Sequence, residues 1–200
     1  AFTCFNLRPV TNQTPWNNIP IRMLNESDLI EKIIERLLEA GKPLPTKFYH
    51  GSSVELKIGT KLGGRPFKSK FGDAEKILEA LRPEGMVGRL NCVYMVSKPG
   101  DVYTAGGSDD FVYEVEPIGP VHAHHGAWLG DVYNYAMMNA SKLTKMGPKL
   151  DRASIKSALE DPKIVKAAEG YWNGVAYKGG SGEVWEYLAQ GAKIVRKVRG

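Results

Sequence analysis

Residues 48–53 of the chain are Phe-Tyr-His-Gly-Ser-Ser, and this stretch says more about the fold than any other. The segment Lys47–His50 favours a strand, and the glycine and hydroxyl residues after it favour a turn. Because Gly51 has no Cβ, a flat ligand can approach the backbone there, while the imidazole and hydroxyls supply hydrogen bonds. A lone strand histidine is more often structural, so the functional interpretation needs support from other segments.

A second stretch carries two tyrosines, Tyr94 and Tyr103, on either side of the sequence Lys-Pro-Gly-Asp at 98–101. If the chain turns there, both rings can face one cleft. Nicotinamide in NAD is a cationic aromatic ring, which favours stacking on electron-rich aromatic faces. The alternative is that one tyrosine belongs to the core and the other to the surface.

The third stretch lies near the C-terminus, where Glu186 interrupts an apolar and aromatic run. Alternation along a strand places Trp185 and Tyr187 on one face, and Glu186 with Val184 on the other. A carboxylate among aromatic residues needs a partner or serves a functional site, although an exposed edge position explains it equally well.

Taken in order, these three stretches resemble the His-Tyr-Glu class of ADP-ribosyltransferases, to which the catalytic domain of diphtheria toxin belongs. FYHGSSVELKIGTKL (48–62) and FVYEVEPIGPV (111–121) are also similar to bacterial rifampin ADP-ribosyltransferases. The resemblance covers roughly residues 46–121 and 182–198. It implies a split two-sheet fold with NAD as a substrate in the cleft between the sheets, and no metal.

The resemblance also implies a role for each matched residue on the adenosine side of NAD and at the nicotinamide amide. His50 would hydrogen-bond the adenosine-side ribose, and backbone groups of Gly51 would hold the nicotinamide amide. Ser52 stands where the family often has threonine.

On the reacting side, the resemblance implies that Tyr94 and Tyr103 sandwich the nicotinamide ring and that Glu186 binds the 2′-hydroxyl of the adjoining ribose. Breaking the nicotinamide–ribose bond creates an oxocarbenium-like centre, and a hydrogen bond to the neighbouring hydroxyl strengthens there. The resemblance thus gives Glu186, His50 and Tyr94 as the expected catalytic residues, with Glu183 as the competing choice for the carboxylate.

Two departures from the family concern the acceptor. The first disfavours arginine as the modified residue, and the second means that rifampin is not implied as a substrate. Arginine-specific relatives carry a second acid two residues before the catalytic glutamate, where this chain has Val184, and an arginine in place of His50. Where the rifampin enzymes have an aspartate, this chain has His122, His124 and His125. On a strand, two of these histidines can share a zinc ion with a third ligand, but a hydrogen-bonded turn or a substrate-lining loop is favoured.

The elements expected along the chain define an α+β class with a mostly antiparallel or mixed sheet. Residues 1–45 form an N-terminal arm with one helix, and residues 46–200 form the catalytic domain. In addition to the segments quoted above, we expect strands over Val54–Leu62 (or a turn), Asn91–Val96 and Phe111–Glu116, a hairpin of Glu183–Leu188 and Lys193–Val198 around Gln190-Gly191, and helices over Asp73–Leu81, Gly130–Leu143 and, interrupted at Pro162, Ser154–Glu169.

Composition excludes several classes of protein. No apolar run approaches the ~20 residues of a membrane helix, and no start of the signal-peptide type is present. Two cysteines far apart indicate a reducing compartment, hence a cytoplasmic protein, although a Cys4–Cys92 bridge stays open if the protein is secreted. The net charge is +5, and the basic clusters at 57–70 and 193–199 are interpreted mainly as solvated faces.

These observations predict an NAD-dependent mono-ADP-ribosyltransferase, a glycosyltransferase of the bacterial or phage effector or toxin-like kind. The acceptor is open, with a protein slightly favoured. The alternatives are an NAD glycohydrolase, an RNA 2′-phosphotransferase and a non-catalytic module that binds NAD or protein.

Overall fold

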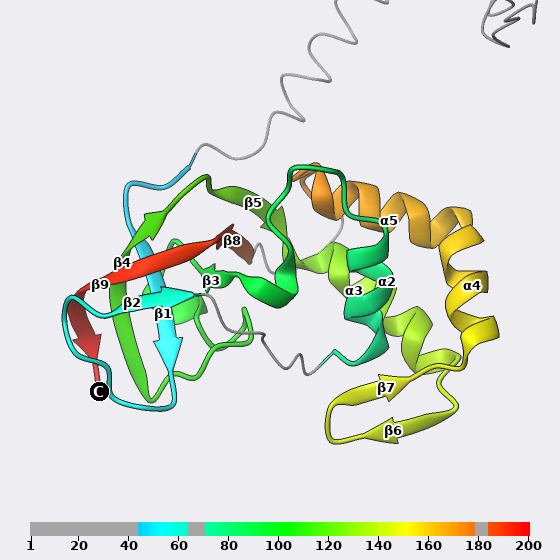
Figure 1. Cartoon of the computed structure of the whole chain (residues 1–200), viewed down its shortest axis with the longest axis horizontal. Coiled ribbons are helices and arrows are strands. Elements are labelled where there is room, and N and C mark those ends of the chain that lie inside the picture. The colour runs from blue at the N-terminus through cyan, green and yellow to red at the C-terminus, as the bar shows by residue number, and fades with distance from the viewer. Residues whose placement is uncertain (1–43, 64–70, 179–183) are drawn as a thin grey trace, which may run out of the picture. The chain divides into compact units, whose positions relative to one another are not determined.

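The computed structural model of the chain describes residues 44–63, 71–178 and 184–200. Within these ranges the protein is an α+β structure whose strand pairs are all antiparallel, which confirms the predicted class (Figure 1). One sheet has the order β1-β4-β9-β2, a second has the order β3-β8-β5, and β6 and β7 form a separate ribbon. The strands are β1 (Phe48–Ser52), β2 (Lys61–Gly63), β3 (Val93–Met95), β4 (Phe111–Ile118), β5 (His122–His125), β6 (Lys142–Thr144), β7 (Gly147–Lys149), β8 (Trp185–Ala189) and β9 (Gly191–Arg199).

The helices begin and end where local chemistry favours it. Asp151 and Asp161 cap two successive helices by accepting hydrogen bonds from the backbone N–H groups of Ser154 and Lys163, at 2.7 and 2.8 Å. Pro162 is the first residue of the second helix, so the predicted interruption at Pro162 is confirmed. The helices are α2 (Asp73–Ala80), α3 (Gly126–Met138), α4 (Arg152–Glu160) and α5 (Pro162–Trp172), with 3-10 turns η1 (Arg89–Asn91) and η2 (Pro99–Asp101).

Two of the predicted elements differ from the structure, and others lie outside the described residues. Helix α3 starts earlier than predicted because the His125 side chain caps it, and residues 142–143 belong to β6 instead. His122–His125 is strand β5 rather than a turn or loop. The predicted arm lies outside the described residues up to residue 43, as do residues 64–70 of the basic cluster and Glu183.

The hairpin prediction is wrong for a topological reason. Strand β8 pairs with β3 and β5, whereas β9 pairs with β4 and β2, so the chain changes sheet at Gln190. A Cβ at Gly191 would lie 2.8 Å from the carbonyl oxygen of Leu62, and glycine therefore allows β9 to start close against β2. The sequence around Gln190-Gly191 has turn character, but each strand finds its partners far away in the sequence.

The two sheets face one another across an apolar cluster. The rings of Phe48 and Tyr187 meet edge to face with centroids 5.4 Å apart and join the two layers. Because strand side chains alternate, one face of each strand supplies this core. Its buried members are Phe48, Val93, Met95, Tyr113, Val115, Trp185, Tyr187, Ala189, Ala192 and Ile194.

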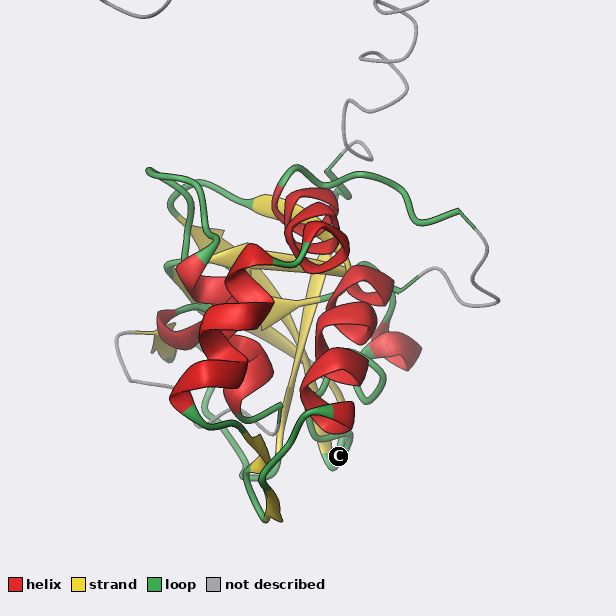
Figure 2. Ribbon diagram, turned by 90° about the vertical axis from the view of Figure 1, so that its right-hand side faces the viewer, coloured by secondary structure: helices red, strands yellow, loops and turns green. Residues whose placement is uncertain are grey.

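Helices cover the other side of the three-stranded sheet (Figures 1 and 2). Helices α2, α3, α4 and α5 share a second apolar cluster, in which the indole of Trp172 donates a hydrogen bond of 2.9 Å to the carbonyl of Leu78. Strand β8 is buried along its whole length between the two layers. As predicted from strand alternation, Trp185 and Tyr187 enter the intersheet core, and Glu186 faces away from it toward Arg89 and Tyr171.

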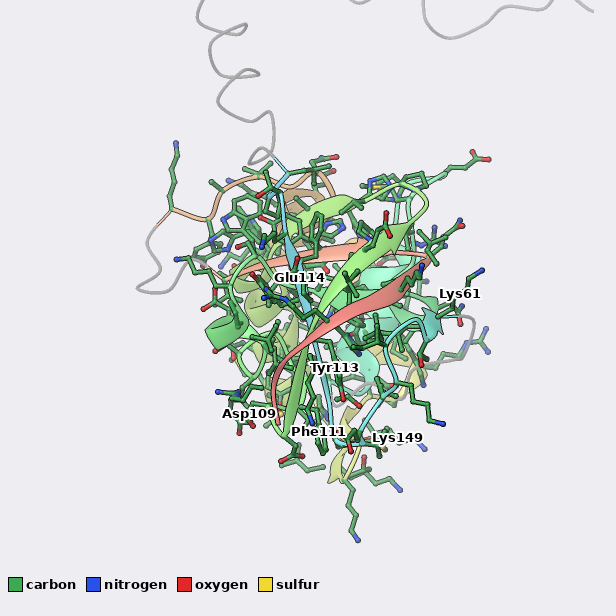
Figure 3. The ribbon with its side chains drawn as sticks, turned by 90° about the vertical axis from the view of Figure 1, so that its left-hand side faces the viewer. Lys61, Asp109, Phe111, Tyr113, Glu114 and Lys149 are labelled. Carbon is green, nitrogen blue, oxygen red and sulfur yellow. The ribbon has the colours of Figure 1, made fainter. Side chains whose placement is uncertain are left out.

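The outer face of the four-stranded sheet carries exposed ion pairs, and Figure 3 shows Glu114 and Asp109 on this side of the molecule. Arg196 contacts Glu114 at 2.6 Å, and Arg199 contacts Asp109 at 3.5 Å. Lys197 is paired as well, with Glu55. This arrangement agrees with the interpretation of the basic C-terminal segment as a solvated face. No helix of the described part is long and apolar enough to cross a membrane.

Candidate active site

Strands β1, β3 and β8 connect His50, Tyr94 and Glu186 in one group: the side chains of Tyr94 and Glu186 meet at Arg89, and His50 joins them through the backbone of Tyr94. The Nδ1 atom of His50 donates a hydrogen bond of 2.9 Å to the carbonyl oxygen of Tyr94, across 44 residues of sequence. Tyr94 is opposite Leu188 in the β3–β8 ladder, two residues along the strand from Glu186. The Tyr94 ring and the Glu186 carboxylate both contact Arg89.

Arg89, in the 3-10 turn η1, is the centre of this group, and only 1% of its surface is exposed. Its Nε and Nη2 atoms donate to the two oxygens of Glu75 at 2.8 and 3.0 Å. Its Nη1 atom donates to the Tyr171 hydroxyl and to Oε2 of Glu186. The guanidinium also lies 4.9 Å from the ring centroid of Tyr94, a cation–π distance.

Burial and charge together set the protonation of this group. Burial alone would lower the pKa of Arg89, but the neighbouring Glu186 carboxylate, with Tyr171, Tyr94 and Glu75, raises it well above its usual range. Burial raises the pKa of the hydroxyls of Tyr171 and Tyr94, against the opposing effect of Arg89. Both phenols therefore stay protonated and act as hydrogen-bond donors, and the Tyr94 hydroxyl donates to the carbonyl of Arg89 at 2.9 Å.

His50 is held as a neutral imidazole. Burial lowers its pKa, and the hydrogen bond to the Tyr94 carbonyl only partly opposes that shift. Because the carbonyl can only accept, Nδ1 carries the proton and Nε2 is the acceptor nitrogen. This tautomer suits a ligand hydroxyl that donates to Nε2.

His124 lies on β5 directly opposite Glu186 of β8. Its Nδ1 atom donates a hydrogen bond of 2.8 Å to the carbonyl of Tyr171, and its ring stacks on the Tyr171 ring at 4.5 Å. Burial lowers the pKa of His124 to about 3, so it is neutral at physiological pH. The described residues contain no group of three or more His, Cys, Asp or Glu side chains arranged to hold a metal ion.

Gly51 and Ser52 serve the chain itself in this structure. A Cβ at Gly51 would overlap the carbonyl oxygen of Ser108 and the side chain of Val102, so glycine is needed where β1 meets the 102–108 segment. The Ser52 hydroxyl donates to the carbonyl of Val54 at 2.7 Å, within a turn.

Tyr103 lies apart from the buried group. It is 71% exposed in the turns that follow η2, and its side chain makes no hydrogen bond or ring contact with another described residue. The structure thus joins His50, Tyr94 and Glu186 and leaves Tyr103 at the surface. A role for Tyr103 in stacking would require that its ring move toward Tyr94.

Two members of the group, Arg89 and Glu75, are not singled out by sequence motifs. Glu75 gives a weak signal, because it is a carboxylate in the first turn of α2 beside the apolar positions Ala74, Ile77 and Leu78. Arg89 gives none, since nothing in its local sequence distinguishes it from a surface arginine. Comparison with models of known protein families and with curated proteins finds no match to this chain.

Proposed function

We propose that the protein is a mono-ADP-ribosyltransferase that cleaves NAD at the nicotinamide–ribose bond. One observation carries the proposal: His50, Tyr94 and Glu186 come from three distant segments and belong to one connected group. The resemblance of the three segments to His-Tyr-Glu ADP-ribosyltransferases requires such a grouping. Two facing antiparallel sheets, with helices inserted between β5 and β8, are compatible with the split two-sheet fold of that class.

The chemistry of the group suits the reaction. When the bond between C1′ and the nicotinamide nitrogen breaks, its electron pair leaves with nicotinamide and positive charge develops on the ribose. A fixed carboxylate at Glu186 stabilises that charge more in the transition state than in the ground state. The nucleophile of the acceptor then bonds to C1′ and releases its proton to solvent water.

The remaining residues would bind and orient NAD. Nε2 of His50 accepts a hydrogen bond from a ribose hydroxyl in this proposal, because Nδ1 is committed to Tyr94. The Tyr94 ring already contacts the cationic guanidinium of Arg89, and an electron-rich face of this kind suits the cationic nicotinamide ring equally well. Tyr103 would close over the ring from the surface.

The test is release of nicotinamide from NAD by the purified chain, compared between Glu186→Gln and Glu75→Gln. Both variants remove one carboxylate charge from Arg89, so a purely structural role predicts similar losses. We expect Glu186→Gln to lose about 10²–10³-fold in turnover, and Glu75→Gln to lose much less per folded molecule. Equal losses would assign Glu186 to structure only.

The same assay separates the other functions. If nicotinamide is released and labelled ADP-ribose reaches no component of a cell lysate, the protein is an NAD glycohydrolase. If NAD binds and is not cleaved, the protein is a binding module. Labelling of one protein in the lysate would support a cytoplasmic effector-like transferase with a protein acceptor.

A further inference from the structure

The two carboxylate oxygens of Glu186 have different surroundings. Oε2 accepts hydrogen bonds from Nη1 of Arg89 and from the Tyr171 hydroxyl, the latter at 3.2 Å. Oε1 accepts no hydrogen bond from the described residues. The protein therefore holds one oxygen by hydrogen bonds, and the other has no hydrogen-bond donor among the described residues.

Glu75 provides the internal comparison, because Arg89 binds it differently. Both oxygens of Glu75 accept from Arg89, at 2.8 and 3.0 Å. The same guanidinium therefore donates hydrogen bonds to both carboxylate oxygens of Glu75, but to only one carboxylate oxygen of Glu186. Only 5% of Glu186 is exposed, and a carboxylate oxygen in such a place normally has a hydrogen-bond partner. A ligand that donates a hydrogen bond would supply the missing one.

Gly126 lies next to this free oxygen. It is the first residue of α3, and its backbone N–H donates to the carbonyl of Val184 at 3.1 Å. A Cβ built on Gly126 would lie 3.4 Å from Oε1 of Glu186. The backbone at Gly126 does not have positive φ, so its conformation does not demand glycine. What glycine provides here is open space beside Oε1.

We infer that Glu186 engages its substrate through Oε1 alone, and that Gly126 is the residue that keeps this oxygen accessible. The inference rests on the proposed function, in which the hydrogen-bond donor is the 2′-hydroxyl of the nicotinamide ribose. The hydroxyl keeps its proton and donates it in a hydrogen bond to Oε1. That bond strengthens as the electron pair of the C1′–N bond leaves with nicotinamide.

The decisive variant is Gly126→Ala, with Gly130→Ala as its matched control. Gly130 lies in the same helix, and a Cβ there meets nothing within 4 Å. Alanine favours helix over glycine, so both variants should melt at or above the wild-type temperature. We expect Gly126→Ala to lose about 10²-fold in kcat/KM for NAD, because its methyl group shields Oε1, and Gly130→Ala to match the wild type.

The outcomes separate the two proposals. If the wild type releases nicotinamide and Gly126→Ala is as active as Gly130→Ala, this inference is overturned and the proposed function stands. If the wild type releases none, the proposed function fails and the inference fails with it.

A second measurement on the unaltered protein does not depend on how the variant folds. Carbodiimide with an added amine labels accessible carboxylates, and mass spectrometry of peptides locates the label. We expect Glu186 to be labelled faster than Glu75, and saturating NAD to slow labelling of Glu186. Labelling of Glu75 as fast as Glu186, or no protection by NAD, would overturn the inference.

Discussion

The two faces of strand β8 bury their side chains by different means. On one face, Trp185 and Tyr187 pack into an apolar cluster between the sheets. On the other face, Glu186 is buried against Arg89. Apolar burial stabilises the fold directly, whereas a buried ion pair returns little net stability, because its desolvation offsets the attraction between the charges. The apolar face therefore explains the stability of the fold. The buried ion pair on the charged face adds little to that stability, so a function is the better explanation for it.

Removing the arginine should have the largest effect, because it would leave two carboxylates buried without a cation. Arg89→Met should lower the free energy of unfolding by about 3–5 kcal/mol, measured by urea denaturation. A loss under about 1 kcal/mol, typical of an exposed pair, would show that water reaches this face and would remove the contrast.

The apolar face should respond to lost volume instead. Ile194→Ala, in the intersheet cluster, should cost about 2–5 kcal/mol, and Ile194→Val about 0.5–1.5 kcal/mol. Under the proposed function, neither should change NAD turnover per folded molecule, because Ile194 is not among the side chains that contact Arg89. A turnover defect in Ile194→Val, assayed well below its melting temperature, would contradict this separation of roles.

The charged face should also respond to pH through His124. Its pKa is about 3 in the folded protein and about 6.5 when unfolded, so between these values the unfolded chain binds a proton that the folded chain does not. Stability is therefore unaffected by His124 above about pH 6.5, and it falls by up to about 1.4 kcal/mol for each pH unit below.

Urea denaturation at about pH 7 and about pH 5 checks this prediction. His124→Leu should reduce the difference between the two free energies of unfolding. Some pH dependence should remain, because burial lowers the pKa of His50 in the same direction. An unchanged difference would place His124 in contact with solvent.

The smallest net change in stability should come from replacing the whole charged group at once. Glu75→Leu, Arg89→Met, Tyr171→Phe and Glu186→Leu together remove every charge of this group and the Tyr171 hydroxyl, while the Tyr94 hydroxyl keeps the carbonyl of residue 89 as its acceptor. Such replacements are often neutral or stabilising. The free energy of unfolding of the quadruple variant should therefore lie within about 1 kcal/mol of the wild-type value, while the proposed NAD turnover should be absent. Failure to fold would show that the charged face specifies the structure itself.

The sequence predicts one side of this comparison better than the other. Strand alternation around Trp185 and Tyr187 identifies the apolar face correctly, whereas for Glu186 the sequence leaves a partnered carboxylate and an exposed edge position equally open. Its partner is not recognisable, because Arg89 lies 97 residues away and pairs through tertiary structure alone. The local sequence indicates which residues are buried. It does not indicate which charged residue, far away in the sequence, pairs with a buried carboxylate such as Glu186.

Turns limited the prediction in the same way. Gln190-Gly191 has the composition of a hairpin turn, yet it connects strands of two different sheets. The resemblance implies that Tyr103 stacks on the same ring as Tyr94, and in this structure the turns after η2 leave Tyr103 71% exposed. Both cases concern how a short segment directs the chain in space, and the residue types alone do not determine that direction.

The wide separation of Arg89 and Glu186 in sequence has a consequence during synthesis. A nascent chain that has not yet reached residue 186 can pair Arg89 with Glu75, but it lacks the carboxylate to which we assign the chemistry. Any activity that depends on Glu186 is therefore withheld from the ribosome-bound chain until β8 has emerged and docked between β3 and β5. Under the proposed function, the order of translation would delay NAD cleavage until this strand is in place.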